Sequence, residues 1–256
     1  MHILLTNDDG VMAPGLAALA KVFQQEHRVT ILAPDRNWSA SGHVKTMHRP
    51  LRVRDTKLAD GTPAMTTDGA PSDCVALAIL GLVSDPIDVV VSGINPLANL
   101  GHDVTYSGTV TAAMEATISR LKGIAVSLDA PDGFKGELDY TPAAEIALRL
   151  ITKILSYQLP EGVLLNINVP YGKVGDIKGV GITKQGQRVY RDKLVHRHDP
   201  HGQAYYWIGG DAPTGVLEPG TDFFALAEGF VSITPLQLDL TAHSSFQTIK
   251  NWSLDL

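Results

Sequence analysis

The chain has little cysteine: Cys74 stands alone among 256 residues, so no disulfide can form within the chain. It lies in the apolar run 74–80, where a buried thiol is expected rather than a nucleophile. The chain also has no apolar run near the roughly 18 residues needed to cross a bilayer. No basic segment followed by a long apolar stretch opens the sequence. We therefore expect a soluble, cytoplasmic protein without a membrane partner.

Positive charge is also scarce. The formal net charge is −6, which argues against a surface that coats a nucleic-acid polymer. A small phosphorylated substrate stays compatible with this charge, because a bound cation can reverse the local field. Hydrophobic residues make up 44% of the chain and charged residues 19%, as in a folded globular enzyme rather than a disordered protein.

Strand-like and helix-like segments alternate over the first 170 residues. Arg28–Ala33 and Ile87–Ser92 are rich in β-branched residues, whereas Val110, Ala113 and Thr117 recur at helical spacing. Such units imply parallel strands with right-handed crossovers, and so a Rossmann-like, doubly wound, mostly parallel α/β sheet. The expected strands are 2–6, 28–33, 51–54, 64–67, 87–92, 124–128 and 163–168, and the expected helices are 15–23, 71–83, 110–121 and 141–157.

The composition changes after Pro170. Residues 177–208 are rich in Gly, Arg, Tyr and His, and the turn sequence 199–202 predicts a long β-hairpin. An isolated hairpin is marginally stable, so we expect it to pack on another subunit. A strand over 229–234 and a helix over 245–252 follow. We interpret 1–256 as one α/β domain, with a Rossmann-like core (1–170) and a hairpin and C-terminal exchange segment for oligomerisation (171–256).

Two adjacent acids, Asp8 and Asp9, lie just past the first predicted strand, after Asn7. Ligands of open α/β sheets collect at the carboxyl ends of the strands. Two close carboxylates repel each other, and a hard cation such as Mg²⁺ or Mn²⁺ relieves that conflict. The alternative is a simple cap of the helix that starts near Pro14.

Three other loops are expected at the same edge of the sheet: 34–42, 92–96 and 106–109. Ser39 and Asn95 carry neutral oxygen donors that suit a hard-cation shell. Ser107, Gly108 and Thr109 precede a predicted helix, where small residues let a phosphate approach free backbone N–H groups. The same three residues also fit an ordinary helix cap.

At these positions the chain resembles the SurE survival-protein family. The resemblance rests on Ile3–Gly10, Ala33–Asn37, Val91–Asn95 and Tyr106–Val110, and more loosely on 205–210 and 232–236. It runs in order from residue 2 to about 243. Members of this family are metal-dependent phosphatases of nucleoside 5′-monophosphates, sometimes of 3′-monophosphates and short polyphosphate.

The resemblance implies a role for particular residues. It implies one divalent ion per subunit, Mg²⁺ or Mn²⁺, held by Asp8, Asp9, Ser39 and Asn95, with Asp8, Asp9 and Asn95 as the catalytic set. It implies phosphate contacts from Ser107, Gly108 and Thr109, and a homodimer or homotetramer that exchanges C-terminal segments. The chain departs from the family pattern at Pro96–Leu97, where a small residue and Gly are usual, and around Trp38.

The phosphatase mechanism has two open forms at this level. In the first, water attacks directly and is deprotonated by an aspartate that is not fully committed to the ion, or by a metal-bound hydroxide. In the second, an aspartyl-phosphate forms first.

Other interpretations are weaker. A haloacid-dehalogenase-type phosphatase needs Asp-x-Asp, and a receiver-like signalling module needs an aspartate after a central strand and a late lysine. Neither pattern is present here. His196, His198 and His201 are spaced for a zinc site on the hairpin. Residues 205–207, two Tyr and a Trp, suit either base stacking or an interface.

Overall fold

The computed structural model describes residues 1–131, 133–252 and 254. Its strands are β1 (His2–Thr6), β2 (Arg28–Pro34), β3 (Val53–Lys57), β4 (Pro63–Thr67), β5 (Val89–Asn95), β6 (Lys122–Asp129), β7 (Val163–Pro170), β8 (Val180–Ile182), β9 (Arg188–His198), β10 (Ala204–Gly215) and β11 (Val231–Gln237). Its α-helices are α1 (Pro14–Phe23), α2 (Pro71–Leu77), α3 (Gly108–Ile118), α4 (Thr141–Leu155), α5 (Asp222–Ala227) and α6 (Phe246–Lys250). Within the described residues, no helix is long and apolar enough to cross a membrane.

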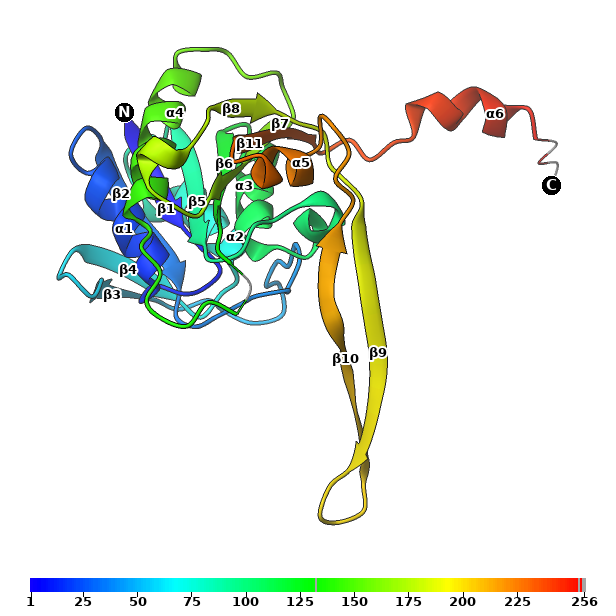
Figure 1. Ribbon diagram of the computed structural model, residues 1–256. Helices are drawn as coiled ribbons and strands as arrows, with labels where there is room; N and C mark the ends of the chain where they lie inside the picture. The colour runs from blue at the N-terminus through cyan, green and yellow to red at the C-terminus, as the bar shows by residue number, and fades with distance from the viewer. Residues whose placement is uncertain (132, 253, 255–256) are drawn as a thin grey trace.

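One nine-stranded sheet forms the body of the molecule, in the order β3-β4-β2-β1-β5-β6-β7-β11-β8 (Figure 1). Strand β1 pairs in parallel with β2 on one side and with β5 on the other. The chain therefore reverses its direction across the sheet at β1, which is where ligand crevices form in doubly wound sheets. The predicted α/β class and the mostly parallel sheet are confirmed; in the described part of this sheet, β3 pairs antiparallel with β4 and β11 pairs antiparallel with β7.

Helices cover both faces of the sheet because the buried strands are apolar on both sides. Ile3 and Leu5 pack in one cluster with α1 and α4. Leu4, between them, packs in a second cluster with α2 and α3. This alternation follows from the two-residue period of a strand. Cys74 belongs to the second cluster and is fully buried, and burial raises the pKa of its thiol, as expected of a structural cysteine.

Several boundaries differ from those expected. The helix predicted over 71–83 ends at Leu77 and continues as one wide turn, Ala78–Leu82, in which Gly81 has a positive φ of 118°. The strand expected over 51–54 lies at Val53–Lys57. Helix α5 and strand β8 were not predicted, because six and three residues are too few to show a periodicity.

The predicted hairpin is present as β9 and β10, which pair with each other and project from the body as a long arm (Figure 1). Its turn is closed by Asp199, whose Oδ1 accepts the backbone N–H groups of His201 and Gln203. Helix α6 also lies apart from the body, at the end of an extended segment (Figure 1). The use of 171–256 in oligomerisation stays a prediction.

The packing of α1 yields the first testable prediction. Leu19 is fully buried between α1 and the sheet. We expect Leu19→Ala to lower the free energy of unfolding by about 2 to 5 kcal/mol, because it removes buried methyl groups and leaves a cavity. Urea unfolding followed by circular dichroism measures this. Leu80→Ala is the control, because the Leu80 side chain is 83% exposed and should cost little. Equal losses in both variants would contradict the placement of α1.

Candidate active site

Loops from distant parts of the chain meet at the carboxyl ends of β1, β2 and β5. They line a cavity of about 360 Å³ that contains five of the predicted site residues: Asp8, Asp9, Ser39, Asn95 and Ser107. Asp8 and Asp9 follow β1, Ser39 follows β2, Asn95 ends β5, and Ser107 immediately precedes α3. The parallel topology brings them together, because strands that run the same way end at the same edge.

Asp8 is held firmly between β1 and α3. Its side chain is buried, and the Thr109 hydroxyl donates a hydrogen bond of 2.5 Å to its Oδ1. Gly108 allows the close approach, since a Cβ at this position would lie 2.6 Å from the Cβ of Asp8. Burial raises the pKa of Asp8, while the Thr109 hydroxyl and the N–H groups at the start of α3 oppose that rise.

Asp9 lies nearer the solvent and has fewer partners. Its Oδ1 accepts a hydrogen bond of 3.2 Å from the Asn37 amide. Burial, followed by the charge of Asp8, raises the pKa of Asp9 to about 7. The alternative that these acids cap a helix is wrong, because α1 begins after Ala13 and no side chain caps it.

The two neutral donors are oriented by their own loops. Ser39 is exposed, and its backbone N–H donates to Asn37 Oδ1 at 2.7 Å. The Asn95 amide nitrogen donates to the Leu97 carbonyl at 2.5 Å, so its Oδ1 is the atom left for a ligand. Pro96, where the chain departs from the family pattern, lies between these two partners and lines the same cavity.

The turn before α3 plays a partly different role from the one expected. Ser107 lines the cavity, and its hydroxyl accepts the Val110 N–H at 3.2 Å as the N-terminal cap of α3. Thr109 requires a correction. The family resemblance implies a phosphate contact from this residue, but its hydroxyl is fully buried and donates to Asp8. The phosphate contacts of Ser107, Gly108 and the Thr109 backbone remain predictions.

An ion pair that sequence reasoning missed also lines the cavity. Arg188 Nε lies 2.9 Å from Asp103 Oδ2, and the guanidinium carbon lies 5.6 Å from the centre of the Phe223 ring. Tyr190 donates to the other oxygen of Asp103 at 2.6 Å. Arg188 opens the hairpin, far from the first loops in sequence, and no local motif marks it.

A second cavity, of about 670 Å³, adjoins the first. The two share Leu97, Ala98 and Arg188 as lining residues. Its other lining residues include the aromatic side chains Tyr171 and Phe223 and the aliphatic Leu226. The charged cavity therefore opens beside a larger one.

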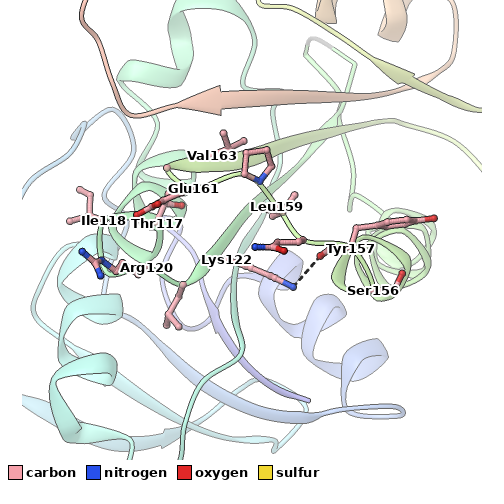
Figure 2. Close-up of a pocket in the computed structure, with 13 residues that line it drawn as sticks. Thr117, Ile118, Arg120, Lys122, Ser156, Tyr157, Leu159, Glu161 and Val163 are labelled. Atoms are coloured by element: carbon pink, nitrogen blue, oxygen red, sulfur yellow. Dashed lines mark hydrogen bonds between the residues drawn. The ribbon is translucent and has the colours of Figure 1, made fainter.

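A further cavity, of about 660 Å³, lies at the opposite edge of the sheet, where β6 and β7 begin (Figure 2). Lys122 lines it, with its Nζ 3.3 Å from the Leu155 carbonyl and 3.4 Å from that of Tyr157. Glu161 is the only carboxylate among its lining residues. None of the predicted site residues reaches this cavity.

The alternative metal site on the hairpin lacks support. Among the described residues, no group of three or more His, Cys, Asp or Glu side chains is placed to hold a metal. The His196 ring instead stacks on Tyr206, with 4.8 Å between ring centres.

The residues at the first cavity suit a hard cation. Their donors are two carboxylates, a hydroxyl and an amide oxygen, which is the oxygen chemistry that Mg²⁺ and Mn²⁺ prefer. Burial raises the pKa of both acids, and the charge of Asp8 adds to the rise at Asp9. Buried acids with a raised pKa in one cavity are candidates for a functional site.

Known proteins resemble this chain over most of its length. Residues 3–192 match the family model described as "Survival protein SurE". The chain is 52% identical over 241 residues to a protein named 5′-nucleotidase SurE from Herpetosiphon aurantiacus, covering 94% of each chain. It is 48% identical to the protein of that name from Chloroflexus aggregans, covering 98% of this chain and 99% of the other. The crystal structure of the SurE protein from Aquifex aeolicus is 37% identical, with a TM-score of 0.82 and 98% of both chains covered. The chain belongs to the SurE survival-protein family.

Proposed function

We propose that this protein is a divalent-metal-dependent nucleotidase that hydrolyses nucleoside monophosphates to nucleoside and phosphate. The observation that carries the proposal is the pair Asp8 and Asp9 in one cavity with Asn95 and Ser107. The names of the relatives support the same chemistry. Neither a receiver-like module nor a haloacid-dehalogenase-type phosphatase has support from them.

Each residue has a distinct role in this proposal. Asp8, Asp9, Ser39 and Asn95 hold one Mg²⁺ or Mn²⁺, which supplies charge neutralisation for the phosphoryl oxygens. Ser107 and the N–H groups at the start of α3 bind the remaining phosphate oxygens. Among the described residues, only the Asn37 amide donates a hydrogen bond to Asp9, so Asp9 is the acid best able to accept the proton of the attacking water.

The adjoining cavity is the proposed binding site for the nucleoside part of the substrate. It starts at Leu97 and Arg188, which also line the charged cavity, so a phosphate bound there would leave its sugar and base beside Tyr171 and Phe223. Aromatic side chains stack on any base, because every base has a π face. A site of this kind accepts several bases rather than one.

Oligomerisation fits the exposed apolar residues of the projecting arm. On the hairpin, Leu194 is 71% exposed and Ile208 is 83% exposed, and Phe246 of α6 is 53% exposed. A long two-stranded arm with these side chains in water is marginal. We propose that the hairpin and α6 pack on another copy of this chain, as a homodimer or homotetramer. Tyr205, Tyr206 and Trp207 then belong to that interface rather than to a base site.

The activity itself is the first test. Phosphate release is measured over nucleoside 5′- and 3′-monophosphates and polyphosphate, with Mg²⁺, Mn²⁺ or a chelator. We expect metal-dependent release from the monophosphates, and a loss of at least about 100-fold in kcat/KM for Asp9→Asn. Asp60→Asn, in an exposed loop, is the control and should keep full activity. Metal-independent release, or full activity in Asp9→Asn, would overturn the proposal.

The raised pKa of Asp9 predicts a pH dependence of stability in the metal-free protein. Its pKa is about 7 when folded and near 3.8 when unfolded, so ionisation favours the unfolded chain as pH rises between these values. Asp9→Asn removes this effect. We expect the variant to gain stability over the wild type from pH 4 to pH 8, and added Mn²⁺ to stabilise the wild type. Urea unfolding in chelator measures the difference. If the difference in the free energy of unfolding between the two proteins does not change with pH, the pKa of Asp9 is not raised in the folded state.

The nucleoside cavity gives a test of substrate fit. Tyr171→Ala should raise KM for AMP about tenfold, because stacking on a base is worth about 1 to 3 kcal/mol. It should leave KM for a phosphate ester without a base nearly unchanged. Tyr157→Ala, in the cavity of Figure 2, is the matched control. An equal rise for both esters would place the base elsewhere.

A further inference from the structure

A buried carboxylate outside the cavity ties the Ser39 loop to α3. Glu115 is 4% exposed, although it lies on the same helix whose first turn holds Asp8. Its Oε2 lies 3.0 Å from His43 Nε2, and its Oε1 accepts a bond of 2.8 Å from Lys45 Nζ. Both partners come from the loop that follows Ser39. A buried charge is costly in free energy unless it is paired. The contacts with His43 and Lys45 therefore offset the cost of burying the Glu115 carboxylate.

Glu115 has no place in the chemistry proposed above. It does not line the cavity, and eight residues of helix separate it from Ser107, which corresponds to about 12 Å. A charge that only served solubility would be exposed. The His43 contact lowers the pKa of Glu115 most, and Lys45 adds to this effect, so the carboxylate stays ionised.

The loop between β2 and this ion pair is fixed at both of its ends. Before Ser39, the Trp38 N–H donates to the Asp8 carbonyl at 2.7 Å. After it, the Gly42 N–H donates to the Tyr106 carbonyl at 3.0 Å, and the Gly42 carbonyl accepts from Thr111 at 3.2 Å. Ala40 between these ends has a positive φ of 57°, which a non-glycine residue adopts only under constraint.

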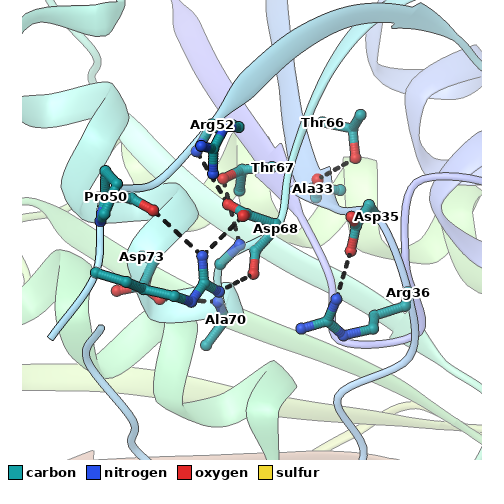
Figure 3. A network of polar contacts seen from close by, with 12 residues as sticks. Ala33, Asp35, Arg36, Pro50, Arg52, Thr66, Thr67, Asp68, Ala70 and Asp73 are labelled. Atoms are coloured by element: carbon teal, nitrogen blue, oxygen red, sulfur yellow. Dashed lines mark hydrogen bonds and ion pairs between the residues drawn. The ribbon is translucent and has the colours of Figure 1, made fainter. Parts of the chain in front are cut away.

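A second buried carboxylate holds the segment just beyond Lys45. Asp73 accepts both the backbone N–H of Thr46 at 2.8 Å and its hydroxyl at 2.7 Å. Asp73 also accepts the Ala70 N–H at the start of α2, at 2.8 Å. Figure 3 shows Asp73 near Ala70, whose backbone N–H it accepts. The 42–46 segment is therefore fastened to α3 by Glu115 and to α2 by Asp73.

From these contacts we infer that Glu115 is a positioning residue for the metal site, which it serves by holding the loop that presents Ser39. The inference rests on the proposed function, since it assigns Ser39 to the metal shell. One rigid helix then sets both sides of the site. Its first turn orients Asp8 through Thr109, and its third turn places Ser39 through Glu115, His43 and Lys45.

The test measures Mn²⁺ affinity by titration calorimetry and by electron paramagnetic resonance, without substrate. Glu115→Ala should raise the Kd for Mn²⁺ about tenfold, as other supporting residues around metal sites do. His43→Ala removes one of the same contacts from the exposed side of the loop and should shift the Kd in the same direction. This second variant keeps the test valid if Glu115→Ala fails to fold. Asp68→Asn, which loses its ion pair with Arg49 further along the chain, is the control and should not change the Kd.

The decisive comparison combines Glu115→Ala with Ser39→Ala. If Glu115 acts through Ser39, the double variant binds Mn²⁺ no more weakly than Ser39→Ala alone. Saturating Mn²⁺ should also restore kcat in Glu115→Ala, because the reacting groups are intact. The positioning role would be overturned if the losses of Mn²⁺ affinity from Glu115→Ala and Ser39→Ala added up in the double variant. It would also be overturned if the Kd were unchanged in both Glu115→Ala and His43→Ala. In either case, Mn²⁺ binding by the wild type would still support the proposed function. A wild-type chain that binds no Mn²⁺ would overturn both.

Discussion

The hydrogen bond from the Thr109 hydroxyl to Asp8 is the contact on which the site depends. It joins the end of the central strand β1 to the start of α3, with Gly108 as the residue that permits the approach. Both partners are buried, so neither can exchange this bond for one to water. Asp8 is thereby fixed before any ligand arrives. Pre-organisation of this kind is what a metal or phosphate site requires.

The same arrangement carries an electrostatic cost. Asp9 follows Asp8 directly, and burial together with that neighbouring charge raises the pKa of Asp9 to about 7. The N–H groups at the start of α3 offset part of the cost at Asp8, but Asp9 has only the Asn37 amide. A fold that keeps two such acids together gains nothing in stability from them. The surrounding sheet, apolar on both faces, supplies the stability that this edge lacks.

Sequence reasoning could place the site because the site follows from topology. Asp8, Ser39 and Asn95 each come after a predicted parallel strand, and such strands end at one edge of the sheet. The features of the site that sequence reasoning did not predict depend on the direction of side chains and on segments that are distant in the sequence. Thr109 belongs to a turn whose sequence fits either a phosphate site or a helix cap, and neither interpretation predicts that its hydroxyl donates to a carboxylate. Arg188 reaches the cavity only because the hairpin begins beside it, and α5, which carries Phe223, is too short to show a pattern.

Helix α3 explains how loops with few contacts of their own can form one site. A loop of mostly exposed residues, such as the one that carries Ser39, has no core to hold it in a single conformation. Glu115 and Thr111 supply that hold from the buried face of α3, and the first turn of α3 fixes Asp8. A helix is stiff over three turns, so the distance between the contacts to the Ser39 loop and the contact to Asp8 stays fixed. The positions of Asp8 and Asp9 relative to the Ser39 hydroxyl are therefore set by the length of α3 rather than by the loops themselves.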